Sequence, residues 1–485
     1  MKKIYISLLV MSVLPGLAAA RQNVLNTNLF ISEEYNSNRY ETEDDRVDYW
    51  MTTLMPSLSL LSSGEHDTVE LTYTPEFLYD HDLDTDDITH DVIFNLDRQL
   101  NSRWQMNLSD NFSYFNFDKI DMGPAGDIVA MFVRADSYVQ EEVVRILFPE
   151  LGDYDPATDY NYVLSELVER YVYASPEKQT RVANLLRPDD PGRRRHYTNE
   201  ATLDFTYSFG QNSSFTFGYT LETLNNKSAG MDEYITHNPH FSLAYVFDQQ
   251  WSLDFSYEYS WWNYDDVEDE SNHETEFRLN FHLSPHDLLY WSYNFAYTDY
   301  DDNIASDFNS QDGGLGWEHD FGSHSHLVAF LGGSYEHRDI FGDERGYEAN
   351  ATFTRDLPQG NYFFGLEGGF DEYNGTQDWE DLREYLTLTA GMNYGLLEDL
   401  SVDAELVYER NVNWSRSIGF WNDHTRTVDN DYDAGVGFIY TFQRWYSVSL
   451  RYNYHVFNTD GAFRDDYYDH QVFLELTVAK DIFHW

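Results

Sequence analysis

The feature that most constrains this fold is a strict two-residue alternation between apolar and polar side chains. It is clearest in segment 251–261, where aromatic or aliphatic residues fill every odd position and polar residues every even one. Successive side chains of a β-strand point to opposite faces, so such a strand has one apolar and one polar face. The polar face carries Asp254 and Glu258, whose carboxylates would be buried without partners if apolar layers covered both faces. The strand therefore needs one apolar and one wet environment.

The same alternation recurs along most of the chain. Further examples are segments 202–209, 215–222, 276–283, 289–298, 362–371, 431–440 and 446–455. Aromatic residues make up 17% of the sequence, yet no stretch after residue 20 approaches the roughly 18 apolar residues of a transmembrane helix. Segments of about 10 alternating residues with many outward aromatics are typical of membrane β-barrels. A soluble sandwich or solenoid, the alternative, does not need them. The sequence predicts a transmembrane antiparallel up-and-down β-barrel.

The connections between these segments alternate between tight and long. Tight turns are predicted at 62–64, 101–102, 210–212, 248–250, 284–286, 322–323, 358–360, 397–399 and 443–444, with acidic loops between them. Bacterial barrels have short periplasmic turns and longer outer loops. Counting strands between these connections gives about 20, within a range of 18–22. An even number places both termini in the periplasm.

The N-terminus has the features of a secretory signal peptide. Lys2 and Lys3 precede the apolar run Ile4 to Leu14, and the small residues Ala18 to Ala20 follow a Pro-Gly break. The sequence therefore predicts cleavage after Ala20 and export to the outer membrane of a Gram-negative cell.

One segment, 119–195, interrupts the alternation with apolar residues at helical spacing. Ser175 followed by Pro176 has the character of a helix N-terminus. The turn pattern places this insert in the third outer loop. Its basic residues are Arg181, Arg187, Arg193, Arg194 and Arg195. We expect a helical insert that folds toward the acidic barrel and constricts or plugs it; the alternative is that its helices pack on one another. The predicted organisation is a signal peptide (1–20), first barrel strands (21–118), insert (119–195) and remaining strands (196–485).

The net charge of −55 makes nucleic acid an improbable partner, because phosphates would be repelled. Many charged residues fall on the polar sides of the predicted strands, where they would line the lumen. They are Glu70, Glu76, Asp204, Glu222, Asp254, Glu258, Glu276, Arg278, Glu367, Asp371, Asp403, Glu405, Asp431, Asp433 and Arg451. This set predicts a pathway that favours cations. Alternatively, the carboxylates only keep a wet interior soluble.

Metal and catalytic signals are weak. Asp82, Asp84, Asp86 and Asp87 resemble the start of a calcium loop, but Asp87 stands where the sharp turn needs glycine. This is a weak calcium candidate. The run 429–433 has similar spacing on a predicted strand and is interpreted as a lumen row. No cofactor and no other metal site are expected, and the absence of cysteine excludes thiol catalysis.

Adjacent Asp and His residues leave a catalytic alternative open. His81 with Asp82, Asp423 with His424, and Asp469 with His470 could serve an enzyme at the barrel rim, of protease or lipase type. Neighbours of this kind also arise by chance in a chain with 17 His and 85 acidic residues. We therefore expect no catalytic residues.

The runs 71–79 and 108–114, with His90 between them, resemble the opening of the β-barrel porin family of Gram-negative outer-membrane proteins. Members are often associated with exopolysaccharide export systems. The resemblance implies a channel that passes polar or cationic solutes or a secreted polysaccharide. The barrel pattern and the acidic outer loops predict outer-membrane lipid, lipopolysaccharide and calcium as partners, and the resemblance adds a saccharide solute and periplasmic export proteins. A rim enzyme and a closed structural or docking barrel are the alternatives.

Overall fold

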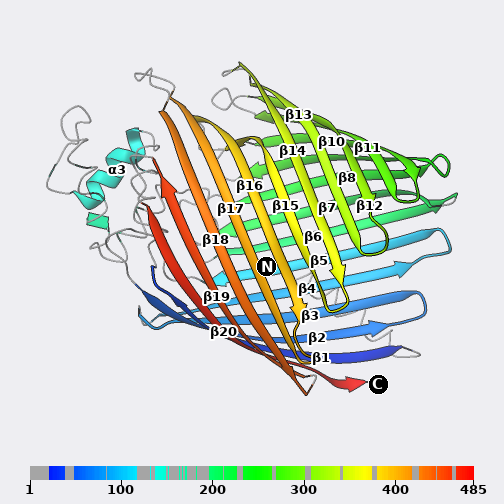
Figure 1. Cartoon of the computed structure of the whole chain (residues 1–485), viewed down its shortest axis with the longest axis horizontal. Coiled ribbons are helices and arrows are strands. Elements are labelled where there is room, and N and C mark those ends of the chain that lie inside the picture. Colours follow the sequence, from blue (N-terminus) through cyan, green and yellow to red (C-terminus); the bar gives the residue numbers. More distant parts are fainter. Residues whose placement is uncertain are drawn as a thin grey trace.

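The computed structural model describes most of the chain between residues 21 and 484 (Figure 1). The described ranges are 21–38, 48–82, 85–116, 137–148, 196–210, 212–226, 233–264, 269–300, 307–338, 342–373, 379–417, 425–443, 445–460 and 466–484. A few single residues between 132 and 182 are also described. The predicted signal peptide lies outside these ranges.

Twenty β-strands form the molecule. They are β1 (Gln22–Asn36), β2 (Tyr49–Ser63), β3 (Asp67–Asp80), β4 (Thr85–Gln99), β5 (Trp104–Asn116), β6 (His196–Phe209), β7 (Ser213–Asn226), β8 (Tyr234–Val246), β9 (Trp251–Tyr264), β10 (Glu270–Ser284), β11 (Asp287–Tyr300), β12 (Phe308–Asp320), β13 (Ser325–Arg338), β14 (Gly342–Leu357), β15 (Gly360–Tyr373), β16 (Trp379–Gly395), β17 (Leu400–Ser417), β18 (Thr425–Phe442), β19 (Tyr446–Thr459) and β20 (Tyr467–His484).

The strands close into a barrel. Each strand pairs antiparallel with the next, and β1 pairs with β20 from Val24↔His484 to Asn36↔Gln471. Closure leaves no sheet edge with unpaired backbone groups, which is the condition for a β-structure to cross a bilayer. The predicted closed antiparallel barrel and its count of about 20 strands are confirmed.

Short and long connections gather at opposite ends of the barrel. Nine hairpins, from β2–β3 to β18–β19, are joined by two to four residues, at the positions where tight turns were predicted. Several of these turns need left-handed backbone conformations, which glycine and asparagine tolerate best. Gly210 has a φ of 62°, Gly322 of 91° and Asn212 of 62°. The start of β1 and the end of β20 lie at this same short-turn end, because Gln22 pairs with Ser63 and Val24 with His484.

The segment between β5 and β6 differs from the prediction. A helical insert is not confirmed, because the described part contains one short helix, α3 (Ser137–Leu147). The predicted helix start at Ser175 and all five insert arginines lie outside the described residues. No helix among the described residues is long and apolar enough to span a membrane.

The apolar residues of this segment are buried, unlike those of the barrel. Val143 and Val144 of α3 are buried, as are Val163, Leu167 and Val182 further along. No extensive contact joins α3 to a barrel strand. Figure 1 places α3 beside the end of the barrel that lies away from the two chain termini of the barrel wall. The burial of these residues is therefore not provided by extensive packing of α3 on the barrel wall.

Candidate functional site

The barrel wall has two chemically different faces. Large apolar side chains are exposed on one of them, and they oppose one another across strands, as in Leu315↔Leu331 and Leu450↔Leu474. Leu315 is 68% and Leu331 66% exposed, so no protein layer covers this surface. We call it the apolar face, and the opposite surface the polar face. An uncovered apolar surface of this extent needs a lipid environment.

Strand alternation and register place the predicted charged residues together on the polar face. Those with described side chains are Glu70, Glu76, Asp204, Glu222, Asp254, Glu258, Glu276, Arg278, Glu367, Asp403, Glu405, Asp431, Asp433 and Arg451. For Asp371, only the backbone pairing with Arg383 is described. Whether these residues form a conduction pathway stays a prediction.

Many of these carboxylates accept hydrogen bonds from the next strand. Glu222 accepts from the Tyr234 hydroxyl at 2.9 Å, and Glu367 accepts from the Tyr385 hydroxyl at 3.1 Å. Neutral donors satisfy these oxygens without cancelling their charge. The polar face therefore remains acidic.

Arg278 of β10 is held by groups from its own strand, from β11 and from β12. Its Nη2 lies 2.6 Å from Glu318 Oε1, its Nε donates to Asn280 Oδ1 at 2.8 Å, and its register partner is Asp254. The guanidinium carbon stands 3.8 Å from the centroid of the Tyr290 ring, a cation–π contact. Glu318 and Tyr290 were not predicted as site residues. The sequence signal for Glu318 was its position between Trp317 and His319, which by alternation places it on the face opposite these two rings.

Arg451 also faces carboxylates. Its Nη1 lies 3.7 Å from Asp403 and its Nη2 3.8 Å from Glu405, while Nε donates to Asn453 at 3.0 Å. Both predicted polar-face arginines thus have acidic partners. Their positive charge is offset locally, and the surplus of carboxylates sets the field of this surface.

Gly316 makes room for an aromatic pair on the polar face. Tyr290 and Phe330 are its register partners on either side, and their rings stack with centroids 6.2 Å apart. A Cβ at Gly316 would lie 1.9 Å from Tyr290 Cζ, so the ring would have to move. Aromatic rings that cover a strand glycine in this way stabilise the local pairing.

Gly316→Ala is expected to destabilise the folded barrel by about 1–3 kcal/mol, because the new Cβ displaces the Tyr290 ring from its packed position beside Phe330. The matched control is Gly333→Ala, where a new Cβ would meet its nearest neighbour at 3.6 Å. The measurement is the urea midpoint of unfolding in lipid vesicles. Equal midpoints for the two variants would contradict the packing assigned to Gly316.

Asp431, Asp433 and His455 form a close cluster on β18 and β19. His455 Nε2 lies 2.8 Å from Asp431 Oδ1, and His455 Nδ1 lies 3.8 Å from Asp433 Oδ1. Among the described residues, this is the one group whose potential ligand atoms have a spacing suited to a metal ion. Alternation had assigned His455 to the polar side of its strand, but its partners follow only from the register of β18 and β19.

The calcium candidate is only partly described, because Asp84 lies outside the described ranges. Asp86 and Asp87 are successive residues of β4, so their side chains point to opposite faces. Asp82 accepts a hydrogen bond from the Trp50 backbone at 2.9 Å. Two of the four carboxylates thus point apart.

The predicted Asp–His neighbours do not form catalytic pairs in the described part of the chain. Asp469 and His470 alternate on β20, where Asp469 opposes His455 and His470 opposes Tyr454. His81 lies 2.7 Å from Thr52 Oγ1 and 3.4 Å from Glu33. Asp423 and His424 lie outside the described residues.

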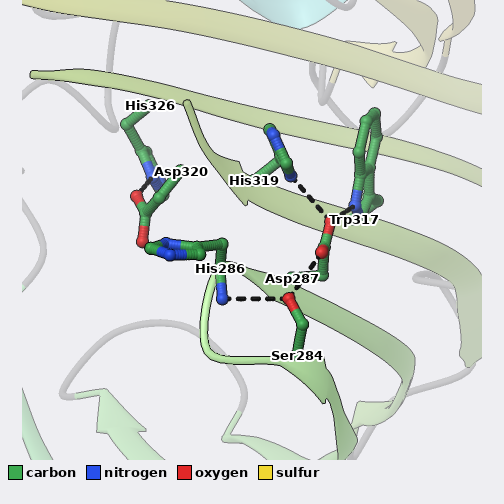
Figure 2. A network of polar contacts seen from close by, with 7 residues as sticks. All are labelled: Ser284, His286, Asp287, Trp317, His319, Asp320 and His326. Carbon is green, nitrogen blue, oxygen red and sulfur yellow. Dashed lines mark hydrogen bonds and ion pairs between the residues drawn. The ribbon is translucent and has the colours of Figure 1, made fainter. Parts of the chain in front are cut away.

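A separate polar network stabilises the short-turn end (Figure 2). Asp287, at the start of β11, accepts hydrogen bonds from Ser284 Oγ at 2.6 Å, His319 Nδ1 at 2.7 Å and Trp317 Nε1 at 3.2 Å. These contacts join the β10–β11 turn to β12. The network positions the rim of the barrel and shows no arrangement of a nucleophile with its base.

Solved structures give the comparison with known proteins. The chain is similar to a mutant of the ferric enterobactin receptor PfeA from Pseudomonas aeruginosa, with 10% identity, a TM-score of 0.52, and coverage of 94% of this chain and 80% of the receptor. It is also similar to the FrpB iron transporter from Neisseria meningitidis, with 7% identity, a TM-score of 0.52, and coverage of 94% and 81%. A further match is OpdL from Pseudomonas aeruginosa, with 12% identity, a TM-score of 0.43, and coverage of 95% and 99%.

No protein-family model and no curated protein matches the chain. At these identities the two matches with a TM-score of 0.52 establish the fold alone. The chain therefore has the fold of outer-membrane β-barrel proteins.

Proposed function

We propose that this protein is an outer-membrane channel through which polar or cationic solutes pass along an acidic lumen. The observation that carries the proposal is the composition of the polar face in a closed barrel. Carboxylates from most of the strands gather there, and Arg278 and Arg451 both stand beside acidic partners. Acidic groups lining a pore raise the local concentration of cations and disfavour anions.

The orientation follows from the ends of the barrel. Bacterial barrels turn tightly on the periplasmic side, so both chain termini would lie in the periplasm and the long connections at the cell surface. The apolar face would contact outer-membrane lipid and lipopolysaccharide. The similarity to a ferric enterobactin receptor and an iron transporter supports this membrane and the general task of solute passage.

The finer alternatives have less support. Passage of a secreted polysaccharide and contact with periplasmic export proteins depend on the family resemblance of the opening strands. A closed docking barrel would need the segment between β5 and β6 to seal the opening. A rim enzyme would need a catalytic arrangement, and the described Asp–His neighbours face residues of other strands instead of each other.

The test is conductance of the purified protein in a planar bilayer. In a gradient of KCl, the reversal potential is expected to have the sign of cation preference, and the preference should weaken as salt screens the carboxylates. A protein that inserts but never conducts would contradict the channel. Anion preference at low salt would contradict the role given to the polar-face carboxylates.

A further inference from the structure

We propose that Asp431, Asp433 and His455 form a binding site for a divalent transition-metal ion of the zinc type on the polar face of β18 and β19. The location of these residues follows from strand register, so the site itself does not depend on conduction. Access from the cell exterior through the lumen does depend on the proposed function. The channel would then have one specific metal-binding site among carboxylates that attract cations in general.

The spacing of the donor atoms fits one ion. One oxygen from each carboxylate and one imidazole nitrogen all lie within 4.8 Å of one another. Ligand atoms on a single tetrahedral zinc ion, each about 2.0–2.2 Å from the metal, lie about 3.3–3.6 Å apart. The donor atoms therefore have to move together by about 1 Å to coordinate one ion, which rotation of the three side chains can supply.

Unsatisfied polar atoms give an independent reason. Asp431 Oδ1 and His455 Nε2 are buried and pair with each other at 2.8 Å, without a further hydrogen bond. Asp469, the register partner of His455 on β20, is only 1% exposed. Its Oδ2 accepts hydrogen bonds from two side-chain amides, but its Oδ1 has none. A buried carboxylate oxygen without a hydrogen bond calls for a further ligand, and Asp469 lies on the strand next to His455.

The charge balance calls for a cation. Three carboxylates, from Asp431, Asp433 and Asp469, surround one imidazole, which leaves negative charge uncompensated even when the ring is protonated. The nearby Arg451 is directed toward Asp403 and Glu405. An imidazole combined with carboxylates suits zinc and its first-row neighbours, whereas calcium and magnesium prefer oxygen ligands alone.

The surroundings leave room for an ion with its water. A cavity of about 160 Å³ is lined by Asp433 and His455 together with Glu405, Asn453, Gln471 and Arg451, whose guanidinium faces Asp403 and Glu405. Polar groups of this kind hold the water molecules that complete the coordination of a metal in an open site. His455 and Asp433 thus stand between a cavity and the buried carboxylates of the wall.

The probe is Zn²⁺ itself, added to the full chain in detergent after chelation and dialysis. Isothermal titration in excess Mg²⁺, which occupies unspecific carboxylates, is expected to show one tight site per chain. His455→Gln should lower the Zn²⁺ affinity by about 10–100-fold, and the more exposed Asp433→Asn should lower it in the same direction. Heat-modifiable migration on gels checks that each variant is folded.

The matched control is His240→Gln. His240 is also on the polar face and has a single carboxylate partner, Asp204, at 2.8 Å from Nε2. Its substitution should leave Zn²⁺ affinity at the wild-type value. Equal affinity in the wild type, His455→Gln and Asp433→Asn would overturn the site even if the barrel conducts. His455-dependent binding to a barrel that never conducts would support the site and contradict only the proposed channel.

Discussion

Deletion of residues 122–190, with the ends joined by a short Gly/Ser turn, is expected to leave a folded barrel and raise its single-channel conductance several-fold. The wall does not need these residues, because β5 pairs directly with β6 from Trp104↔Tyr207 to Phe115↔His196. Outer loops also tolerate such changes better than strands. Removal of material from the outer opening should therefore widen the path without opening the sheet.

The reason to expect a large effect is the compactness of this segment. Val143, Val163, Leu167 and Val182 are all fully buried, so the described residues of this segment are packed. The arginine run 193–195 directly precedes β6 in the sequence. Unlike charges about 4 Å apart at a partly screened site attract by several kcal/mol, and we expect such an attraction to the polar-face carboxylates to draw the segment toward the lumen.

The control for this deletion shortens another outer connection, residues 418–424, by the same kind of Gly/Ser turn. Its conductance should stay near the wild-type value. If deletion of 122–190 also leaves conductance unchanged, the segment lies outside the pore. It would then be a surface cap or a docking domain for a partner.

The strands and their faces could be predicted from sequence because the information is local. In segment 251–261, successive side chains point to opposite faces, so the alternation in polarity assigns each residue to a face. The assignment is clear because the side facing lipid is apolar and the side facing water is polar. Turn positions are local as well, because glycine and asparagine occupy three of the four left-handed positions of the described chain, and Gln443 occupies the fourth. The strand number followed from counting these turns.

The partners across strands could not be predicted, because they depend on register. Arg278 meets Glu318, 40 positions away, and Tyr290 stacks on Phe330 over Gly316. A slip of one residue in any intervening strand would move such a partner to the other face. The cluster of His455 with Asp431 and Asp433 was overlooked for the same reason.

The insert illustrates a different limit. Apolar residues at helical spacing predicted several helices, and the described part contains α3 alone. Most of the buried apolar residues of the described chain nevertheless belong to this segment. Apolar spacing indicates that a segment packs, but it fixes helix boundaries poorly.

Leu331→Arg is expected to destabilise the barrel by about 2–4 kcal/mol in lipid vesicles, the cost of an arginine near the bilayer midplane. Leu331 lies in the middle of β13, is 66% exposed and opposes Leu315 and Ala349 on the apolar face. The guanidinium would have to enter hydrocarbon or pull water toward it. The measurement is the urea midpoint of unfolding from the bilayer.

The matched control, Ser334→Arg, places the same side chain three residues away on the polar face of the same strand. Its register partners are Asp312 and Gly346, so the new charge would meet a carboxylate and water rather than lipid. We expect its stability to stay close to that of the wild type. Because the two variants share strand, charge and side-chain size, the difference between them measures the environment of each face. Equal costs, or recovery of the wild type as a soluble periplasmic protein, would contradict the assignment of the apolar face to the membrane.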